Sequence, residues 1–272
     1  MKQAMIFAAG LGTRLKPLTD TMPKALVPVA GQPLLWHVVQ KLKAAGFGRI
    51  VINVHHFAQQ IVDYLQANKN FGIDIQISDE TDGLLETGGG IKKALPLFDD
   101  SWPVLIHNVD ILSNVDLAAL YDYAQQSRAD ALLLVSQRKT KRYLLFDDEY
   151  LLDGWTNIET GEVIMPPKLG GRRGLNKQTE LHEINIIRSD PQPPNLGGLC
   201  KLAFSGIHVV LPHVFPLFSD MPSRFGIIDF YLKYCHQCAF LGYKKKDLRL
   251  MDVGKLDTLS EAEAFLQDVL AK

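Results

Sequence analysis

A loop rich in glycine and proline follows the first apolar run of the chain. The segment FAAGLGTRLKPLTDTMPKALVPVAGQPLL spans residues 7–35, contains Gly10 and Gly12, and carries Arg14 and Lys24 among its few basic side chains. Backbone N–H groups in a glycine-rich turn after a strand can surround an oxyanion. Prolines restrict φ and thereby fix the directions in which the cations project. This segment therefore predicts a loop that binds phosphate groups.

Two common phosphate-binding motifs do not fit this loop. No Gly-Lys-Ser/Thr follows the glycines, which excludes a Walker A loop, and Leu15 stands where the third glycine of G-x-G-x-x-G belongs. A dinucleotide-binding dehydrogenase would also need an acidic residue at the end of the second strand, where Asn53 stands instead. These residues thus argue against a dinucleotide-binding dehydrogenase.

Two further segments have residue types suited to binding a metal ion or a ligand. Asp110 follows the apolar run PVLIH, where a carboxylate can hold a hard cation shared with phosphate oxygens; a turn or helix cap is the alternative role. Three consecutive glycines at 88–90 precede the helix-like run IKKAL. They indicate either a close approach of the backbone to a ligand, or a plain loop or helix-start glycine cluster without such a contact.

The elements that must position these residues alternate between strand and helix in the first half of the chain. Short connections between alternating strands and helices predict a mostly parallel sheet with helices on both faces, an α/β fold. The expected strands are 3–10, 49–56, 72–80, 102–111 and 130–138, and the expected helices are 34–46, 57–68, 91–98 and 117–129.

After about residue 143 the pattern changes to a hairpin-rich elaboration. Residues 143–165 read as antiparallel strands with turns at Asp153-Gly154 and Thr160-Gly161. The C-x-x-C formed by Cys235 and Cys238 has no second pair at zinc spacing, so we expect these cysteines to pack a helix. The remaining expected elements are a strand at 202–211, a helix at 229–238, a final strand pair within 240–254 and a helix at 256–271.

Taken together, the loop at 7–35, the ETGGG segment, the Asn-Val-Asp at 108–110 and the Met-Asp-Val-Gly at 251–254 resemble sugar-phosphate nucleotidyltransferases (NDP-sugar pyrophosphorylases). The resemblance implies a GT-A-like, Rossmann-type α/β fold. It also implies Mg²⁺-dependent transfer of a nucleoside monophosphate from NTP to a sugar 1-phosphate, with release of pyrophosphate. A single domain is expected, with a nucleotide-binding half at 1–142 and a sugar-binding half at 143–272.

The resemblance assigns roles residue by residue. Arg14 and Lys24 are the implied catalytic cations, which hold the triphosphate and the transferred phosphoryl group. Asp110 and Asp252 are the implied Mg²⁺ ligands, and two such carboxylates can flank one or two ions. The implied nucleotide-binding residues are Ala9, Gly10, Gly12, Thr13, Arg14, Gly88 and Gly89, and the implied sugar-site residues are Asn108, Ser205, Gly206 and Asp229.

Two positions depart from the family pattern, and Asp229 has a second interpretation. Val109 replaces the glycine of a Gly-Asp pair, and Lys255 replaces the threonine of Asp-Val-Gly-Thr. These departures keep open a non-catalytic nucleotide-sugar sensor on the same fold, since fold does not fix function. Asp229 could equally serve the N-terminus of its helix.

Within the family, the chain most resembles short bacterial N-acetylmuramate 1-phosphate uridylyltransferases. The segment LETGGGI and the compact length favour this group, so UTP is the expected nucleotide. A guanylyltransferase that acts on mannose or heptose 1-phosphate is the alternative. The chain shows no hexapeptide repeat after its last helix, so a second acetyltransfer activity is not expected.

Composition sets the remaining expectations. The net charge of -1 and the pI near 6.7 provide no global field for nucleic acid or an anionic membrane. With no secretory signal, no apolar stretch of the ~20 residues that span a bilayer, and 3 cysteines, we expect a cytoplasmic protein. We expect a monomer or homodimer.

Residues 155–198 have no clear counterpart in the family. We expect an insertion that faces the substrate or a partner subunit, although a solvated loop without a role is an equal alternative. Its glycine turns and cations are Gly170-Gly171, Gly197-Gly198, Arg172, Arg173 and Arg188.

Overall fold

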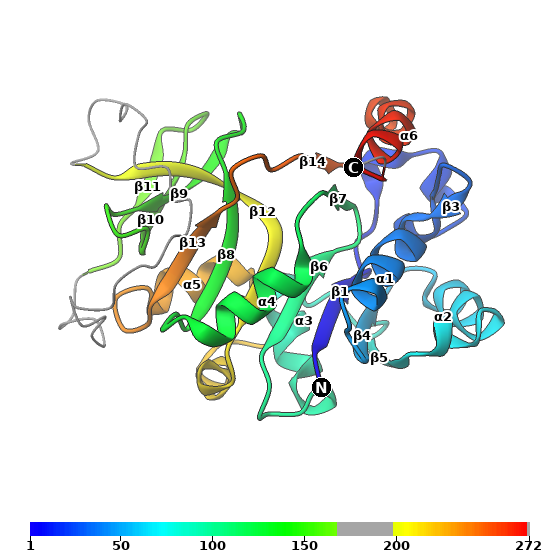
Figure 1. Ribbon diagram of the computed structural model, residues 1–272, viewed down its shortest axis with the longest axis horizontal. Coiled ribbons are helices and arrows are strands. Elements are labelled where there is room, and N and C mark those ends of the chain that lie inside the picture. Colours follow the sequence, from blue (N-terminus) through cyan, green and yellow to red (C-terminus); the bar gives the residue numbers. More distant parts are fainter. Residues whose placement is uncertain (168–197, 271–272) are drawn as a thin grey trace.

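The computed structural model describes residues 1–167 and 198–270, and within them ten strands form one central sheet (Figure 1). The strands are β1 (Gln3–Phe7), β2 (Pro28–Val29), β3 (Gln32–Pro33), β4 (Arg49–Val54), β5 (Asp74–Asp79), β6 (Val104–Asn108), β7 (Ile111–Ser113), β8 (Ala131–Ser136), β9 (Arg142–Phe146), β10 (Leu152–Asn157), β11 (Glu162–Ile164), β12 (Cys200–Val210), β13 (Phe240–Lys244) and β14 (Leu250–Asp252). The helices are α1 (Leu34–Ala44), α2 (Ala58–Ala67), α3 (Glu86–Ala94), α4 (Leu117–Gln126), α5 (Ile227–Tyr234) and α6 (Leu256–Leu270).

The sheet is mixed, with its parallel strands in the N-terminal half. Its main path runs β11-β10-β9-β12-β6-β1-β4-β5, while β8 pairs with both β12 and β13. Strands β4, β1 and β6 are parallel neighbours, and β5 continues this arrangement beside β4. Strand β12 is antiparallel to β6 and β8. The predicted fold class, a mostly parallel α/β sheet with a hairpin-rich C-terminal part, is confirmed.

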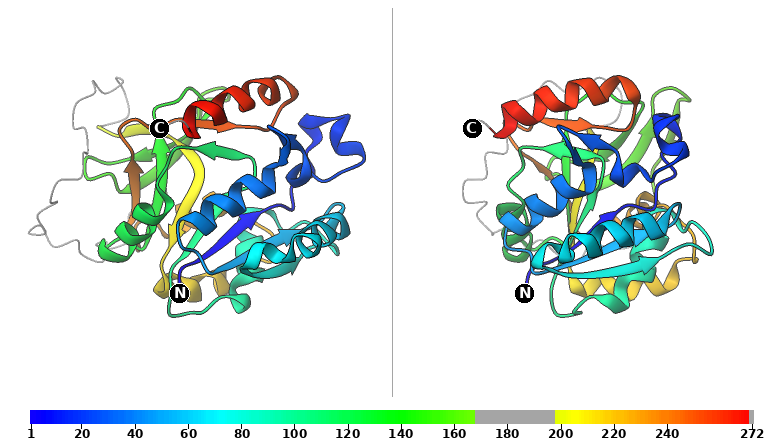
Figure 2. Two further views of the ribbon diagram at one scale, coloured as in Figure 1. Left: turned by 45° about the vertical axis from the view of Figure 1, so that its right-hand side comes forward. Right: turned by 90° about the vertical axis from the view of Figure 1, so that its right-hand side faces the viewer.

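Helices cover both faces of the sheet. Buried residues of α1, α2, α4 and α6 pack in one apolar cluster, and those of α3 and α5 pack in a second cluster on the other face. Because the central strands are buried on both faces, they read as continuous apolar runs. Figure 2 shows α6 along one end of the sheet, next to the N-terminal loop, and Ala30 N donates to Glu263 Oε1 there at 3.1 Å. None of the described helices is long and apolar enough to span a membrane.

The helix expected at 91–98 begins earlier in the structure. Helix α3 begins at Glu86, so the three glycines lie inside its first turns rather than in a preceding loop. The N–H groups of Gly88 and Gly89 both donate to Phe225 O, at 2.9 and 3.1 Å. The close approach that these glycines permit is therefore to the chain itself, in the segment before α5.

This packing predicts a strong effect of a single methyl group. A Cβ at position 89 would lie 2.3 Å from the backbone oxygen of Ser223. Although alanine stabilises an open helix by about 1 kcal/mol over glycine, we expect Gly89→Ala to lower the free energy of unfolding by about 2 kcal/mol because of overpacking. Denaturant unfolding measures this change. Gly83→Ala is the matched control, since its Cβ would meet nothing within 4 Å; equal stability of both variants would contradict the packing argument.

Two details of the C-terminal part also differ from expectation. The turn between β9 and β10 lies at Asp147, whose Oδ1 accepts from the N–H groups of Glu149 and Leu151, whereas Asp153-Gly154 lies within β10 at a register shift. Strands β13 and β14 both form, but they do not pair with each other: β13 is parallel to β8 and β14 is antiparallel to β7. The turn at Thr160-Gly161 forms as expected, with Gly161 at φ 73°.

The cysteine pair has a packing role within the described residues. Helix α5 ends at Tyr234, and Cys235 and Cys238 are both buried in the apolar cluster beneath it. No group of three or more metal-ligating His, Cys, Asp or Glu side chains occurs in the described part of the chain. Of the predicted insertion at 155–198, the structure describes residues 155–167 and Gly198. Gly170, Gly171, Gly197 and the three arginines lie outside the described residues.

Candidate active site

A cavity of about 400 Å³ opens where β1, β4 and β6 end. Ligands of open α/β sheets bind at the carboxyl ends of the strands, so this is the expected location. The lining residues come from the end of β1 and the loop after it, the ends of β4 and β6, the segment after β5 and the start of α3: Phe7, Ala8, Ala9, Gly10, Lys24, Asn53, Glu80, Leu84, Glu86, Thr87, Asn108, Val109 and Asp110.

The loop after β1 is held in shape by its own hydrogen bonds. Gly12 adopts φ 65°, and its carbonyl accepts from Leu15 N and from Thr19 Oγ1, both at 2.8 Å. A Cβ at Gly12 would lie 3.1 Å from Lys24 Cβ, so the stem of Lys24 packs directly on this glycine. A left-handed residue with no room for a side chain requires glycine. Gly12 thus positions Lys24, in addition to the phosphate-contact role that the sequence predicts.

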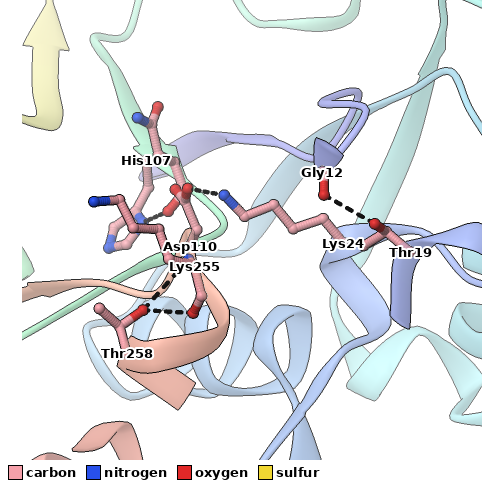
Figure 3. A network of polar contacts seen from close by, with 8 residues as sticks. Gly12, Thr19, Lys24, His107, Asp110, Lys255 and Thr258 are labelled. Carbon is pink, nitrogen blue, oxygen red and sulfur yellow. Dashed lines mark hydrogen bonds and ion pairs between the residues drawn. The ribbon is translucent and has the colours of Figure 1, made fainter. Parts of the chain in front are cut away.

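Lys24 and Asp110, which both line the cavity, form an ion pair. Figure 3 shows the Lys24 amino group directed at the Asp110 carboxylate. Their side chains are only 11% and 16% exposed, so solvent screens this pair less than a surface pair.

Asp252 and Arg14 join this pair around Gly254. A Cβ built on Gly254 would lie 2.6 Å from Asp252 Oδ1, 3.0 Å from Arg14 Nη2 and 3.4 Å from Lys24 Nζ. Val253 N donates to Asp110 O at 2.8 Å, which ties the end of β14 to the loop after β6. Four residues from three distant parts of the sequence therefore meet in one cluster of two cations and two carboxylates.

The electrostatics of this cluster suit a further cation. Desolvation raises the pKa of Asp252 above its usual value, and the neighbouring Asp110 carboxylate acts in the same direction, while Lys24 and Arg14 oppose both. Two adjacent carboxylates provide hard oxygen donors of the kind that Mg²⁺ prefers, and Mg²⁺ usually takes only one or two protein carboxylates beside water and phosphate oxygens. The donor set therefore fits Mg²⁺.

The predicted nucleotide-binding residues divide into two groups. Ala9 and Gly10 line the cavity, and Thr13 and Arg14 lie exposed on the same loop. Gly88 and Gly89 do not line it: added Cβ atoms there would meet the Phe225 ring and Ser223 O. Their neighbours Glu86 and Thr87 line the cavity instead.

Only some of the predicted sugar-site residues lie close to one another in the structure. Gly206 adopts φ 72°, and a Cβ there would lie 2.6 Å from Asn108 Nδ2, so Asn108 and Gly206 are neighbours. The buried hydroxyl of Ser205 has no hydrogen-bond partner among the described residues. Asp229 Oδ2 accepts from Gly226 N at 3.0 Å, which is the helix N-terminal role that the sequence left open.

The two departures from the family pattern have local structural roles. Val109 is 4% exposed, packs in the apolar core, and donates its N–H to Phe7 O at 3.2 Å. Lys255 precedes α6, and its carbonyl accepts from Thr258 Oγ1 at 2.8 Å (Figure 3). Neither residue displaces Asp110 or Asp252 from the cluster.

One buried carboxylate in the cavity wall was not expected. Glu80 is 1% exposed and follows β5 directly. The signal that identifies it is the one that identified Asp110, a carboxylate at the carboxyl end of a strand in the parallel part of the sheet.

Comparisons with known proteins identify the family of the chain. Residues 3–144 match the family model described as nucleotidyl transferase. Over 123 residues the chain is 48% identical to N-acetylmuramate alpha-1-phosphate uridylyltransferase of Neisseria meningitidis, covering 45% of this chain and 52% of that protein. Over 111 residues it is 50% identical to the Caulobacter vibrioides protein of that name, covering 40% and 46%. Mannose-1-phosphate guanyltransferase of Yarrowia lipolytica is 31% identical over 137 residues, covering 50% and 38%.

Solved structures show the same fold over nearly the whole chain. UDP-glucose pyrophosphorylase complexed with UDP-glucose superposes with a TM-score of 0.72 at 17% identity, covering 98% of this chain and 99% of that one. HddC from Yersinia pseudotuberculosis complexed with GMP-PN gives 0.69 at 19% identity, covering 98% and 100%. The sequence matches span about half the length of the two uridylyltransferases. Because the family model covers more than half of this chain, the protein belongs to the nucleotidyl transferase family.

Proposed function

We propose that the protein transfers a nucleoside monophosphate from NTP to a sugar 1-phosphate, giving an NDP-sugar and pyrophosphate. The observation that carries this proposal is the cluster of Arg14, Lys24, Asp110 and Asp252 beside the cavity. Two cations and a carboxylate pair at the end of a parallel sheet suit a ligand that carries both phosphates and a metal ion. Residues 1–142 would serve mainly the nucleotide and 143–272 the sugar.

In the proposed reaction, an oxygen of the sugar phosphate attacks the α-phosphorus of the NTP in line, and pyrophosphate leaves. Lys24 and Arg14 neutralise charge on the phosphates, and the ordered loop after β1 holds the α-phosphorus in position. Asp110 and Asp252 would hold Mg²⁺, which when bound supplies charge neutralisation between the phosphate oxygens. No side chain needs to form a covalent bond with the substrate.

The proposed nucleotide is UTP, and the proposed acceptor is N-acetylmuramate 1-phosphate or a related sugar of cell-wall or glycan precursors. Two relatives of about 50% identity bear the uridylyltransferase name, which supports this choice. A guanylyltransferase that acts on mannose or heptose 1-phosphate is the second candidate, supported by the relatives named for mannose 1-phosphate. We further propose that the protein is cytoplasmic and a monomer or homodimer.

A pyrophosphate-release assay tests the proposal. Four NTPs are each combined with glucose, mannose, heptose and N-acetylmuramate 1-phosphates, with Mg²⁺ or with excess EDTA. We expect release to be fastest with UTP and N-acetylmuramate 1-phosphate and to stop with EDTA. Fastest release with GTP and mannose or heptose 1-phosphate would favour the second candidate. No release with any pair, despite NTP binding by calorimetry, would favour a nucleotide-sugar sensor.

A further inference from the structure

A chain of buried hydrogen bonds connects Glu80 to the phosphate-binding loop. Asn53 Nδ2 donates to Glu80 Oε1 at 2.8 Å, and Ala8 N donates to Asn53 Oδ1 at 2.7 Å. The second carboxylate oxygen, Oε2, accepts from Leu85 N at 3.1 Å. Asn53 is 3% exposed and Glu80 1% exposed, and both line the cavity. All three donors in this series of hydrogen bonds are uncharged groups.

The Glu80 carboxylate and the Ala8 N–H together fix the orientation of the Asn53 amide, which lies between them. A carboxylate only accepts, whereas an amide has one accepting and one donating end. Since Glu80 presents only acceptors, the NH₂ group of Asn53 must face it, and the Asn53 oxygen must face Ala8. That oxygen fixes the N–H of Ala8, and the next residues, Ala9 and Gly10, line the cavity.

The same carboxylate also fixes the other wall of the cavity. Leu85 N precedes α3, whose Glu86 and Thr87 line the cavity, and a Cβ at Gly90 would lie 2.8 Å from Glu80 Oε1. Helix α3 therefore closes over the carboxylate. Through its two oxygens, Glu80 joins the start of α3 to the loop after β1.

We propose that Glu80 is a positioning residue that aligns the phosphate-binding loop and the start of α3 for the nucleotide, by fixing the orientation of the Asn53 amide. This inference rests on the proposed nucleotide function of the same cavity. It assigns Glu80 no contact with reacting atoms. Its role depends on the polarity of the side chain and not on its size.

The proposal can be tested by exchanging the carboxylate at position 80 and the amide at position 53, because the two groups differ in which hydrogen bonds they donate and accept. In Glu80→Gln, the new amide brings its own donor to the chain. The four donors are then the new amide, Asn53 Nδ2, Leu85 N and Ala8 N. Whichever way the two amides are turned, at least one of these donors loses its acceptor. In Asn53→Asp, two carboxylates face each other.

The double variant, Glu80→Gln with Asn53→Asp, restores the complete set of bonds. The new amide at position 80 donates to the new carboxylate at position 53 and accepts from Leu85 N. The carboxylate at position 53 in turn accepts from Ala8 N. The net charge of the double variant equals that of the wild type.

The four proteins, with Glu159→Gln as an exposed control, are compared by UTP and GTP calorimetry, by kcat and KM, and by thermal unfolding. Loss of one buried bond should weaken NTP binding and raise the KM for NTP on the order of tenfold in Glu80→Gln. The KM for the sugar 1-phosphate should stay unchanged. The double variant should recover most of the NTP affinity and of the melting temperature, even if Glu80→Gln alone fails to fold.

Three results would overturn the proposal: wild-type NTP affinity in Glu80→Gln, a double variant no better than Glu80→Gln, or a double variant that does not fold. A wild-type protein that binds NTP without turnover would refute the proposed transfer activity only, since the affinities still measure the role of Glu80. A wild type that binds no NTP would overturn both.

Discussion

Asp110→Asn should reduce turnover by about 10³-fold or more while the protein still unfolds cooperatively. The substitution keeps the size of the side chain and removes its negative charge. In the cluster at Gly254, Asp110 faces Lys24 and raises the pKa of Asp252, so it lies where a metal ion and the phosphates would meet. Without this charge the proposed Mg²⁺ would lose an anionic ligand, and Asp252 alone would balance Lys24 and Arg14 in the cluster.

The fold should tolerate this change. The Lys24 and Asp110 side chains are only 11% and 16% exposed, so loss of their pair should lower the free energy of unfolding by roughly 3 kcal/mol or less, since Asp252 remains as a counter-charge for Lys24. Steady-state kinetics over a range of Mg²⁺ concentrations measures the effect, with denaturant unfolding to check stability. Asp122→Asn is the matched control, because Asp122 pairs with Lys2 on an exposed surface of α4.

A companion variant separates the metal role of Asp110 from its role as the partner of Lys24. Asp252→Asn should also lower turnover strongly, because Asp252 is the second proposed ligand. Both variants should raise the Mg²⁺ concentration that gives half-maximal rate. Near-normal turnover in Asp110→Asn would refute the metal assignment.

The sequence predicts the parallel half of the fold well because that half is governed by burial. Strands such as β1 and β4 are covered on both faces, so their residues are continuously apolar and contrast clearly with the amphipathic α1. Their order along the chain then places Gly10, Asn53 and Asp110 at one edge of the sheet. The site could be located from this rule before any distance was known.

The errors arise where a distant segment decides local structure. The sequence places the start of the helix at 91, after the glycines, because glycine disfavours helix. The helix begins at Glu86 instead, and the Phe225 ring and Ser223 O leave no room for a side chain at positions 88 and 89. Likewise, β14 pairs with β7 rather than with its neighbour β13. No property of residues 240–254 alone specifies a partner more than 130 residues earlier.

Glu80 illustrates a third kind of omission. Its position at the end of β5 is visible in the sequence, but its proposed positioning role depends on its hydrogen bonds with the amide of Asn53 and the N–H of Leu85. These partners are identified only by their geometry. A nearly fully buried carboxylate whose donors are neutral groups becomes informative once the structure shows what it accepts from.

Lys24→Ala and Arg14→Ala should each reduce kcat/KM by roughly 10²-fold or more, which is about 3 kcal/mol of transition-state stabilisation. Lys24 is held by Gly12 and Asp110, so its ammonium is already in place when the phosphates arrive. Arg14 is exposed on the same loop and loses more side-chain freedom on contact with substrate. We therefore expect the Lys24 variant to lose mainly kcat and the Arg14 variant to show a larger increase in the KM for NTP.

Lys24→Arg and Lys69→Ala complete this test. The planar guanidinium of arginine is bulkier than the ammonium of lysine and directs its donors differently, so it should not reproduce the position of the ammonium beside Asp110 and Gly254. Lys24→Arg should therefore not restore activity. Lys69 is an exposed cation beyond α2, and its removal should leave the kinetics unchanged. If the alanine variants of Arg14, Lys24 and Lys69 behave alike, the loop after β1 does not act on phosphates. If Lys24→Ala alone is impaired, the ion pair with Asp110 matters but the wider cation cluster does not.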